Sequence, residues 1–378
     1  MRPMLSTLDT PAALVDRERL ARNIARMQSR LDSLGVKFRP HVKTTKCIEI
    51  ARAQLEAGAR GITVSTLKEA QQFHAAGFDD ILYAVGLVPG KLQQVLALRQ
   101  AGCNLKVITD NAAAAAEIGR AAREEGITLE VWIEIDTDGH RSGVKPESAQ
   151  LIEVGRALVE SGAVLGGVMT HAGSSYDLDT PEALAAMAEQ ERAGCVRAAE
   201  RLREQGWACP NVSVGSTPTA LSAKSLPGVT EVRAGVYVFF DLVMANVGVC
   251  APQDIALSVL TTVIGHQPEK GWAIVDAGWM AMSRDRGTQK QRHDYGYGQV
   301  CGEDGNVLPG YVLTGANQEH GILSREGAKD EDIEKRFPVG TRLRILPNHA
   351  CATGAQFPQY EAVGKDGAVV TWPRFYGW

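Results

Sequence analysis

The sequence predicts an α/β protein in which a (β/α)8 barrel is joined to a second, mostly β domain. Over the first 240 residues, short apolar runs alternate with amphipathic segments rich in Ala, Arg, Glu and Gln. This alternation is typical of the strands and crossover helices of a parallel barrel. After about residue 245, strand-like runs bounded by Gly and Pro take over. We therefore expect residues 11–245 to form the barrel, and residues 1–10 and 246–378 to form the β-rich domain.

Eight apolar runs are the candidate barrel strands, and each is followed by a helical or loop crossover. They cover residues 12–15, 36–38, 61–64, 81–84, 105–108, 129–135, 165–169 and 212–214. The helix pattern is clearest over residues 17–34, where apolar residues recur every three or four positions and Gly35 ends the run. The strand-like runs of the second domain cover residues 255–265, 271–277, 310–314, 341–346 and 368–372.

Composition narrows the class of function. The 378 residues carry 40 basic and 44 acidic side chains, a net charge of −4 without runs of one sign, which argues against binding to nucleic acid or a membrane surface. No apolar stretch is long enough to span a membrane, and the N-terminus lacks the apolar segment of a signal peptide. Seven irregularly spaced cysteines fit reduced thiols in a cytoplasmic protein, and all except Cys351 are expected to be packing residues.

Polar side chains gather where the predicted barrel strands end, which is where barrel proteins carry their chemistry. His41 and Lys43 both follow the second strand, two residues apart. The later strand ends bring residues 136–141, 171–176, 215–219 and 233–237 to the same edge. A lysine opposite turns rich in Gly, Ser and Thr suits a phosphorylated aldehyde cofactor held as a Schiff base. An ordinary turn is the alternative interpretation of the Gly-Ser-Thr segment.

His349 and Cys351 form a second candidate site near the C-terminus. If this segment is a strand, residues i and i+2 point the same way, so an imidazole and a thiolate could bind one metal ion. Two protein ligands leave room for water and substrate, as a catalytic metal requires. A thiolate favours zinc, although manganese, cobalt or magnesium could serve. The alternative is a pair of ordinary side chains in the β domain.

Taken together, these motifs resemble the fold-type III pyridoxal-phosphate enzymes of the alanine-racemase-like superfamily. Within it the chain is most similar to the metal-dependent D-threonine aldolase and D-serine dehydratase group, essentially from end to end. The motifs that carry the resemblance are 9–12, 39–44, 171–173, 215–219, 233–237 and 347–351. The runs 135–143 and 278–286 are most similar to members of the group that act on 3-hydroxyaspartate.

The resemblance implies a role for each candidate residue. Lys43 would bond to pyridoxal 5'-phosphate and then accept the substrate's α-proton. The residues expected to cradle the phosphate, partly through main-chain N–H groups, are Gly215, Ser216, Thr217, Gly235, Val236 and Tyr237. His171 and Tyr176 would pack near the pyridine ring, or else be satisfied within the barrel. Arg141 would approach the phenolic oxygen, or else form a structural ion pair, and Arg233 resembles the arginine that faces the pyridine nitrogen in racemases.

The resemblance also implies a reaction class. In the aldolases the ligand that accompanies the metal-binding histidine is an aspartate, and in the dehydratases it is a cysteine, so Cys351 favours elimination. We expect a dehydratase of a D-3-hydroxy amino acid such as 3-hydroxyaspartate, giving a 2-oxo acid and ammonia, in a homodimer with a small-molecule substrate. The alternatives are an aldolase that releases glycine and an aldehyde, a D-serine dehydratase, and a non-catalytic cofactor carrier. The predicted β domain argues against the carrier.

Overall fold

The computed structural model describes residues 4–378, and the chain divides into two compact units. The barrel unit comprises residues 26–235 and 376–378, and the β unit comprises residues 1–25 and 236–375. The first boundary falls within helix α1 (Arg17–Ser33). The expected barrel covered residues 11–245. In the structure, the N-terminal segment of the β unit extends to residue 25, and its second segment begins at residue 236, ten residues earlier than expected. No helix within residues 4–378 has the length and apolar character needed to cross a membrane.

The barrel unit holds an eight-stranded parallel sheet in the order β2-β9-β8-β7-β6-β5-β4-β3. A parallel bridge between His41 and Thr63 joins the end of β2 to β3. The strands are β2 (Lys37–Phe38), β3 (Ile62–Val64), β4 (Asp80–Gly86), β5 (Asn104–Thr109), β6 (Glu130–Ile135), β7 (Val164–Thr170), β8 (Asn211–Val214) and β9 (Glu231–Val232). The sheet is therefore the curled parallel barrel that the sequence predicts.

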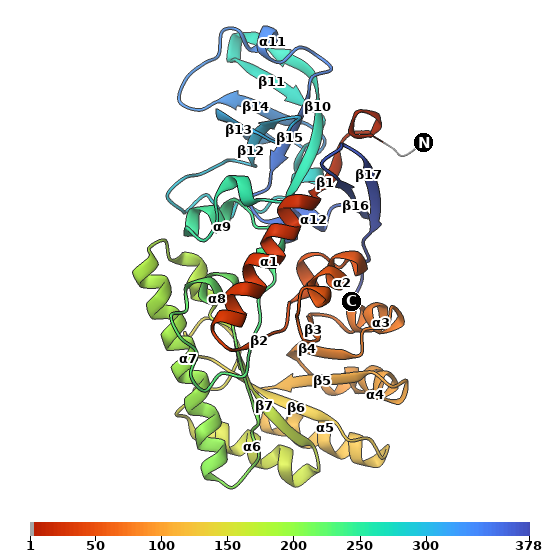
Figure 1. The fold of residues 1–378 in the computed structure, drawn as a ribbon, viewed down its shortest axis with the longest axis vertical. Helices are drawn as coiled ribbons and strands as arrows, with labels where there is room; N and C mark the ends of the chain where they lie inside the picture. The colour runs from red at the N-terminus through yellow and green to blue at the C-terminus, as the bar shows by residue number, and fades with distance from the viewer. Residues whose placement is uncertain (1–3) are drawn as a thin grey trace. The chain divides into compact units, whose positions relative to one another are not determined.

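Helices lie outside these strands (Figure 1). They are α2 (Ile48–Glu56), α3 (Leu67–Ala75), α4 (Leu92–Gln100), α5 (Ala112–Glu124), α6 (Ala149–Ser161), α7 (Pro181–Glu204) and α8 (Thr217–Ser222), with 3-10 turns η2 (Val42–Thr44), η3 (Pro89–Lys91) and η4 (Gly173–Asp177). Leu82, Ile108, Trp132 and Met169 form a buried cluster contributed by four neighbouring strands. The same alternation of apolar runs and amphipathic segments that predicts the barrel thus produces both its core and its outer layer.

One of the predicted barrel strands is wrong, and one barrel strand was missed. Residues 12–15 form β1 (Ala12–Asp16), which pairs antiparallel with β10 and parallel with β16 in the β unit. The place in the barrel is taken by β9, which has only two residues and begins with the buried carboxylate of Glu231. A two-residue strand that starts with an acidic side chain gives no apolar run, which is why periodicity did not find it.

The β unit contains one sheet of nine strands in the order β11-β14-β13-β12-β15-β10-β1-β16-β17. Besides β1 they are β10 (Leu257–Gln267), β11 (Trp272–Val275), β12 (Gln299–Gly302), β13 (Val307–Ala316), β14 (Gly321–Arg325), β15 (Arg342–Leu346), β16 (Gln359–Val363) and β17 (Val369–Pro373). The sheet is mostly antiparallel, and β10 also pairs with β11. All five predicted strand-like runs are strands here, whereas β12, β14 and β16 were not anticipated.

Short helices and turns complete the β unit. They are η1 (Leu5–Thr7), η5 (Val236–Val238), α9 (Leu242–Val247), η6 (Pro252–Asp254), η7 (Pro268–Lys270), α10 (Trp279–Met282), α11 (Ile333–Arg336) and α12 (Ala350–Gly354).

In α1, the apolar positions Leu20, Ile24, Met27 and Leu31 are all buried, as their spacing predicts. Gly35 then adopts a left-handed φ of 70°, a conformation that glycine adopts without steric cost.

Candidate active site

Lys43 lies where the chain leaves β2 at the carboxyl end of the barrel. It belongs to the 3-10 turn η2, and its side chain is exposed. His41 caps this turn, because its Nδ1 accepts a long hydrogen bond of 3.4 Å from the Lys43 main-chain N–H. The other ring nitrogen of His41 lies 3.3 Å from the Ser65 hydroxyl at the end of β3. The lysine is therefore accessible at the barrel mouth, on a turn anchored to the neighbouring strand.

A buried carboxylate supports the same turn from α3. Glu69 accepts the main-chain N–H of Ser65 at 2.9 Å and forms an ion pair with Lys46 at 3.1 Å. Lys46 has a φ of 46°, in the left-handed region that residues other than glycine rarely adopt. The ion pair with Glu69 helps to retain this conformation three residues after Lys43. The turn that carries Lys43 is thus fixed at both ends.

His171 follows β7 at the same edge and is held in one orientation. Its Nδ1 lies 3.0 Å from the Gly215 carbonyl oxygen, and its ring centroid is 6.2 Å from that of Tyr176. Burial, together with the charges of Arg141 and Lys43, lowers the His171 pKa to about 3. A neutral imidazole has one N–H, so Nδ1 donates to Gly215 and Nε2 is left as an acceptor.

The His41 pKa is also lowered well below its usual value, first by burial and then by the charges of Lys43, Arg233 and Arg141. Both histidines are therefore neutral at physiological pH. Because the same cations act on both rings, the strand ends carrying Lys43, Arg141 and Arg233 lie close enough to form one electrostatic cluster. The structure thus brings these predicted site residues together.

The Gly215-Ser216-Thr217 turn after β8 is tightly bonded within the protein. The Gly215 N–H donates to Glu191 at 3.0 Å, and the Ser216 N–H donates to the Thr219 hydroxyl at 3.0 Å. Gly215 has a φ of 132°, and an added Cβ would lie 2.1 Å from the Arg233 carbonyl oxygen, so only glycine fits. These two N–H groups are not directed at a ligand, and a phosphate would depend on other groups of the turn.

Glu191 is a site residue that sequence reasoning missed. Its side chain is 1% exposed, and one carboxylate oxygen accepts the N–H groups of both Ala172 and Gly215, at 2.9 and 3.0 Å. Burial raises its pKa, and the hydrogen bonds oppose that rise. Glu191 therefore ties the turn after β7 to the turn after β8. It lies in the middle of α7, where a glutamate normally faces solvent, so nothing in the local sequence pattern distinguishes it.

The two candidate arginines have different surroundings. The Arg141 side chain is 46% exposed and lies 3.8 Å from the buried Glu134 carboxylate, a loose ion pair. Arg233 is buried and donates to the Ser213 hydroxyl and the Thr170 carbonyl oxygen, both within the barrel. Both interpretations of Arg141 stay open, because a half-exposed guanidinium can pair with Glu134 and also reach a ligand. The Arg233 guanidinium is held by its hydrogen bonds to residues of β8 and β7.

The last three predicted phosphate residues follow β9. An added Cβ on Gly235 would lie 2.9 Å from the His41 carbonyl oxygen and 3.1 Å from the Thr44 hydroxyl, so this glycine permits close approach of two chain segments. Val236 and Tyr237 begin η5 in the β unit, and both side chains are buried. Their chain positions directly follow the barrel edge, whereas their side chains contribute to packing.

The His349–Cys351 pair does not lie on a strand, so that part of the sequence interpretation is wrong. Strand β15 ends at Leu346, His349 is the N-cap of α12, and Cys351 lies in the first turn of that helix. The two side chains nevertheless interact directly, because His349 hydrogen-bonds to Cys351. A helix start rather than a strand brings an imidazole and a thiol together. The Pro347-Asn348 pair after β15 is the local signal that the strand stops.

Two carboxylates surround this histidine. The His349 Nδ1 lies 2.6 Å from Asp285 Oδ2, and the buried Asp241 accepts the Ala350 N–H at 2.9 Å. Burial lowers the His349 pKa, but Cys351, Asp285 and Asp241 outweigh it and raise that pKa to about 11. Asp285 was not predicted as a site residue. Its role is visible only in three dimensions, because 64 residues separate it from His349.

This arrangement fits a divalent metal ion. Histidines that bind metals usually donate one ring N–H to a carboxylate, as His349 does to Asp285, which leaves the other nitrogen for the metal. A metal ion that binds an imidazole and a thiol displaces the proton that the two groups share. Across residues 4–378 no group of three or more His, Cys, Asp or Glu side chains is arranged to hold a metal ion.

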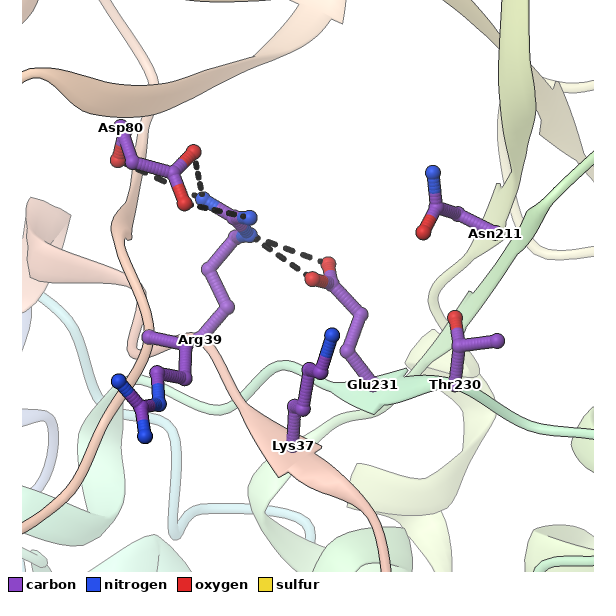
Figure 2. A pocket seen from close by; sticks show the side chains of 7 residues that line it. Lys37, Arg39, Asp80, Asn211, Thr230 and Glu231 are labelled. Atoms are coloured by element: carbon purple, nitrogen blue, oxygen red, sulfur yellow. Dashed lines mark hydrogen bonds and ion pairs between the residues drawn. The ribbon is translucent and has the colours of Figure 1, made fainter.

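A separate pocket of about 380 Å³ opens at the amino ends of the barrel strands (Figure 2). The residues that line it all have polar or charged side chains; they are Lys37, Arg39, Arg60, Asp80, Asn211, Thr230 and Glu231. Arg39 crosses the space between Asp80 and Glu231 and pairs with both (Figure 2). Barrel enzymes carry their chemistry at the other end of the strands, so this pocket is distinct from the cluster around Lys43.

Comparison with known proteins identifies the family. Residues 15–243 match the model described as "Alanine racemase, N-terminal domain", and residues 256–363 match the "Putative serine dehydratase domain". The chain therefore belongs to the fold-type III, alanine-racemase-like pyridoxal-phosphate enzymes, in the group that includes D-serine dehydratases and D-threonine aldolases.

Particular relatives refine this placement. The chain is 67% identical to D-threo-3-hydroxyaspartate dehydratase of Delftia sp. (strain HT23) over the full length of both proteins, and the structure of that enzyme matches with a TM-score of 0.99. It is 32% identical to a D-threonine aldolase from Arthrobacter sp., covering 92% of this chain and 87% of the aldolase. The D-threonine aldolase structure from Filomicrobium marinum is 26% identical, with a TM-score of 0.85 over 99% of this chain and 97% of that one.

Proposed function

We propose that this protein is a pyridoxal-phosphate- and divalent-metal-dependent dehydratase that converts D-threo-3-hydroxyaspartate to oxaloacetate and ammonia. The observation that carries the proposal is the 67% identity to a dehydratase of that name over the whole length of both chains. The interacting pair His349 and Cys351, with Asp285 behind it, supports the metal requirement. A form of the Delftia enzyme with a cysteine-to-alanine substitution is described as metal-free, which agrees with a cysteine ligand.

Lys43 is the residue proposed to bind the cofactor and to move the α-proton. Its amine is exposed at the barrel mouth on a turn that His41 and Glu69 hold in place. Pyridoxal phosphate, when bound, supplies an electron sink that acidifies the substrate Cα–H. The neutral His171, with Nδ1 committed to Gly215, would keep an acceptor nitrogen at the same edge. We place the phosphate near the Gly215–Thr217 turn and residues 235–237, with Tyr176 and Arg141 around the ring.

His349 and Cys351 are proposed to hold a metal ion that assists departure of the β-hydroxyl. Hydroxide is a poor leaving group, and a Lewis acid on its oxygen lowers the barrier. The thiolate favours zinc, with manganese, cobalt and magnesium as the other candidates. Overall, the α-proton and the β-hydroxide leave as water to give an enamine, the enamine tautomerises to an imine, and one water hydrolyses the imine to the keto acid and ammonia.

Location and assembly follow from composition and family. We propose a cytoplasmic enzyme, because the seven cysteines of this chain are present as thiols rather than disulfides among residues 4–378. We propose a homodimer, as the family resemblance implies. Size-exclusion chromatography with light scattering measures the latter directly.

Product analysis tests the proposed reaction. Purified protein is incubated with each stereoisomer of 3-hydroxyaspartate, with D-serine and with D-threonine, before and after chelation and metal restoration. We expect ammonia and oxaloacetate from the D-threo isomer, loss of both after chelation, and recovery with zinc or manganese. Glycine and glyoxylate as the products would identify an aldolase instead. A strong preference for D-serine would identify a D-serine dehydratase.

A further inference from the structure

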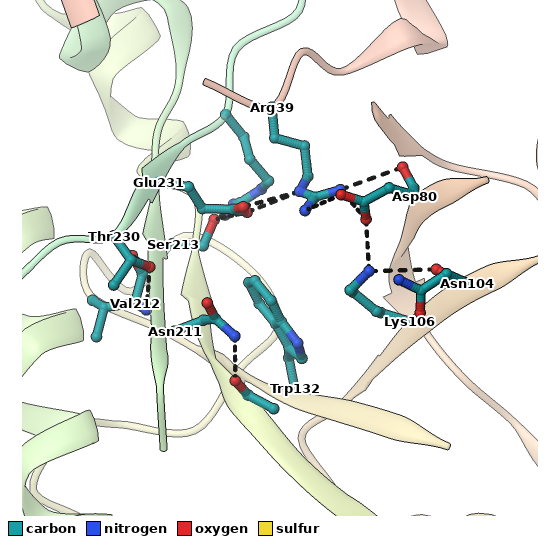
Figure 3. A network of polar contacts seen from close by, with 12 residues as sticks. Arg39, Asp80, Asn104, Lys106, Trp132, Asn211, Val212, Ser213, Thr230 and Glu231 are labelled. Atoms are coloured by element: carbon teal, nitrogen blue, oxygen red, sulfur yellow. Dashed lines mark hydrogen bonds and ion pairs between the residues drawn. The ribbon is translucent and has the colours of Figure 1, made fainter. Parts of the chain in front are cut away.

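A line of buried charges of alternating sign runs inside the barrel from the amino-end pocket to Arg233. In order, it comprises Lys106, Asp80, Arg39, Glu231 and Arg233, which we call the charge ladder. Figure 3 shows the first four of these residues. Four of these side chains are less than a tenth exposed, and Asp80 is the partly exposed member at the amino-end pocket. The charges come from strands β4, β5 and β9 and from the segment after β2.

The lower steps of the ladder are ion pairs with good geometry. The Lys106 Nζ lies 2.6 Å from Asp80 Oδ1, and Arg39 donates from two nitrogens to the two Asp80 oxygens at 2.9 and 3.2 Å. The Arg39 Nε also donates to both oxygens of Glu231, at 3.2 and 3.0 Å. Arg39 thus spans two carboxylates, and both Figure 2 and Figure 3 show it between them. The Glu231 carboxylate is therefore held by Arg39 through both of its oxygens.

The upper step passes through a hydroxyl group. Ser213 Oγ donates to Glu231 Oε1 at 2.8 Å and accepts from Arg233 Nη1, while Arg233 Nη2 donates to the Thr170 carbonyl oxygen. A serine has one O–H, so committing it to Glu231 leaves only lone pairs for Arg233. A guanidinium has only donors, so Arg233 must donate to the Ser213 oxygen, and the Ser213 O–H is left to donate to Glu231. The Arg233 guanidinium is fixed at two points on the side that faces the barrel interior.

The upper end of the ladder lies among the groups of the candidate active site. Burial lowers the Arg233 pKa, and the neighbouring carboxylates of Glu231 and Glu191 act in the opposite direction. Arg233 in turn is one of the cations that lower the pKa of His41 and of His171. If these ion pairs served only to hold the barrel strands together, Arg39 with its two carboxylate partners would be sufficient. Here the ladder continues to the one buried arginine at the edge that carries Lys43.

We propose that Ser213 and Glu231 are positioning residues, which fix the orientation of Arg233 at the carboxyl edge of the barrel for catalysis at the Lys43 site. This inference rests on the proposed function for its kinetic consequence. Displacing a group by about 1 Å can lower a rate on the order of 100-fold, so loss of the Ser213 hydroxyl should act on kcat. Substrate affinity should change little, because neither residue lies at the surface of the site.

The test compares three holoenzyme variants. Ser213→Ala removes the bridging hydroxyl, Ser213→Thr restores one, and Thr230→Val is the control. Thr230 directly precedes Glu231, and the hydrogen bonds of its hydroxyl are to the Val212 main chain, so its loss affects the same chain segment but not the ladder. We expect kcat for ammonia release to fall on the order of 10- to 100-fold in Ser213→Ala with KM little changed. Ser213→Thr should recover much of this loss, and Thr230→Val should lower only the melting temperature.

Two further measurements keep the outcome clear. Glu231→Gln keeps the shape but removes the charge, and it should also lower kcat, so it replaces Ser213→Ala if that variant does not fold. In ¹⁵N-arginine-labelled holoenzyme, the guanidinium signals of Arg233 should be resolved and exchange slowly, and they should broaden or merge in Ser213→Ala. Wild-type kcat in both Ser213→Ala and Glu231→Gln, or unchanged Arg233 signals, would overturn the inference. Absence of ammonia with wild-type protein would instead refute the proposed reaction, and the Arg233 signals would still test the positioning role.

Discussion

The carboxyl edge of the barrel and the His349–Cys351 turn of the β unit hold reactive groups in contrasting ways. At the barrel edge the groups come from five separate strand ends, and carboxylates from elsewhere, such as Glu69 and Glu191, fix the connecting turns. At the His349–Cys351 turn, two adjacent side chains of one helix start do the work, with Asp285 behind them. A covalently bound cofactor requires many fixed contacts, whereas one metal ion requires a few donors and open positions.

Removing Lys43 is the largest single disruption of the barrel edge. In Lys43→Ala we expect covalent cofactor to be lost and turnover to fall by about 10² to 10⁴ from the missing proton acceptor alone. The measurement is borohydride reduction followed by peptide mapping, beside the ammonia assay. Lys37→Ala is the matched control, because it removes an exposed lysine of β2 that lies at the opposite end of the barrel. Cofactor trapped on a lysine other than Lys43 in the wild-type protein would contradict the assignment.

The His349–Cys351 turn should respond to loss of its supporting carboxylate. In Asp285→Ala, His349 loses the partner of Nδ1, so we expect metal affinity to weaken by about 10- to 100-fold. Titration with zinc or manganese, followed by bound metal and by ammonia release, measures this change. Asp304→Ala is the control, since Asp304 caps an exposed turn of the same unit. Equal affinity in the two variants would show that Asp285 does not orient the metal ligand.

Glu191 should affect the stability of the barrel edge. Glu191→Ala leaves the N–H groups of Ala172 and Gly215 without their acceptor in a buried place, which costs about 1–3 kcal/mol for each unpaired group. Glu191→Gln retains an oxygen at the accepting position and should lose much less. Glu189→Ala, on an exposed face of α7, is the control. Urea unfolding of the three variants gives the free energies, and equal values for Ala and Gln would contradict this account.

The neutral histidines predict a smaller effect, on stability at acid pH. The folded-state pKa of His171 is about 3, below the ordinary value of 6.5. The unfolded chain therefore binds more protons between these values, so stability is full above pH 6.5 and falls as the pH drops, by about 1.4 kcal/mol per unit. In cofactor-free protein, His171→Asn should have a shallower slope than the wild type. The exposed His320 gives the control His320→Asn, and identical slopes in all three proteins would exclude a neutral buried His171.

Sequence pattern predicted the large elements of both units. The alternating apolar runs correctly predicted seven barrel strands. The change from amphipathic segments to short strand-like runs after residue 245 predicted the β unit. The same method assigned residues 12–15 to the wrong sheet, because a strand's own residues do not say which strand it pairs with. It missed β9, whose two residues are too few for a period. Local pattern thus identifies strands better than it identifies their partners.

The site residues divide in the same way. Residues in strand-end motifs, such as Lys43 and His171, could be proposed from position along the chain. Glu191 and Asp285 could not, because each acts through space on a turn or ring far away in sequence. The His349–Cys351 pair was found for a reason that proved wrong, since the strand alternation that suggested it is absent and a helix start brings the side chains together.

The most direct test of the contrast between the barrel edge and the His349–Cys351 turn is a paired measurement on Cys351→Ala. Bound metal per subunit and cofactor trapped on Lys43 by borohydride are determined in one preparation, beside Cys301→Ala, which removes a buried cysteine of β12 in the same unit. We predict that Cys351→Ala loses its metal and ammonia release but keeps the trapped cofactor, whereas Cys301→Ala keeps all three. Full metal occupancy and wild-type ammonia release in Cys351→Ala would contradict the metal site and, with it, the proposed metal-assisted elimination.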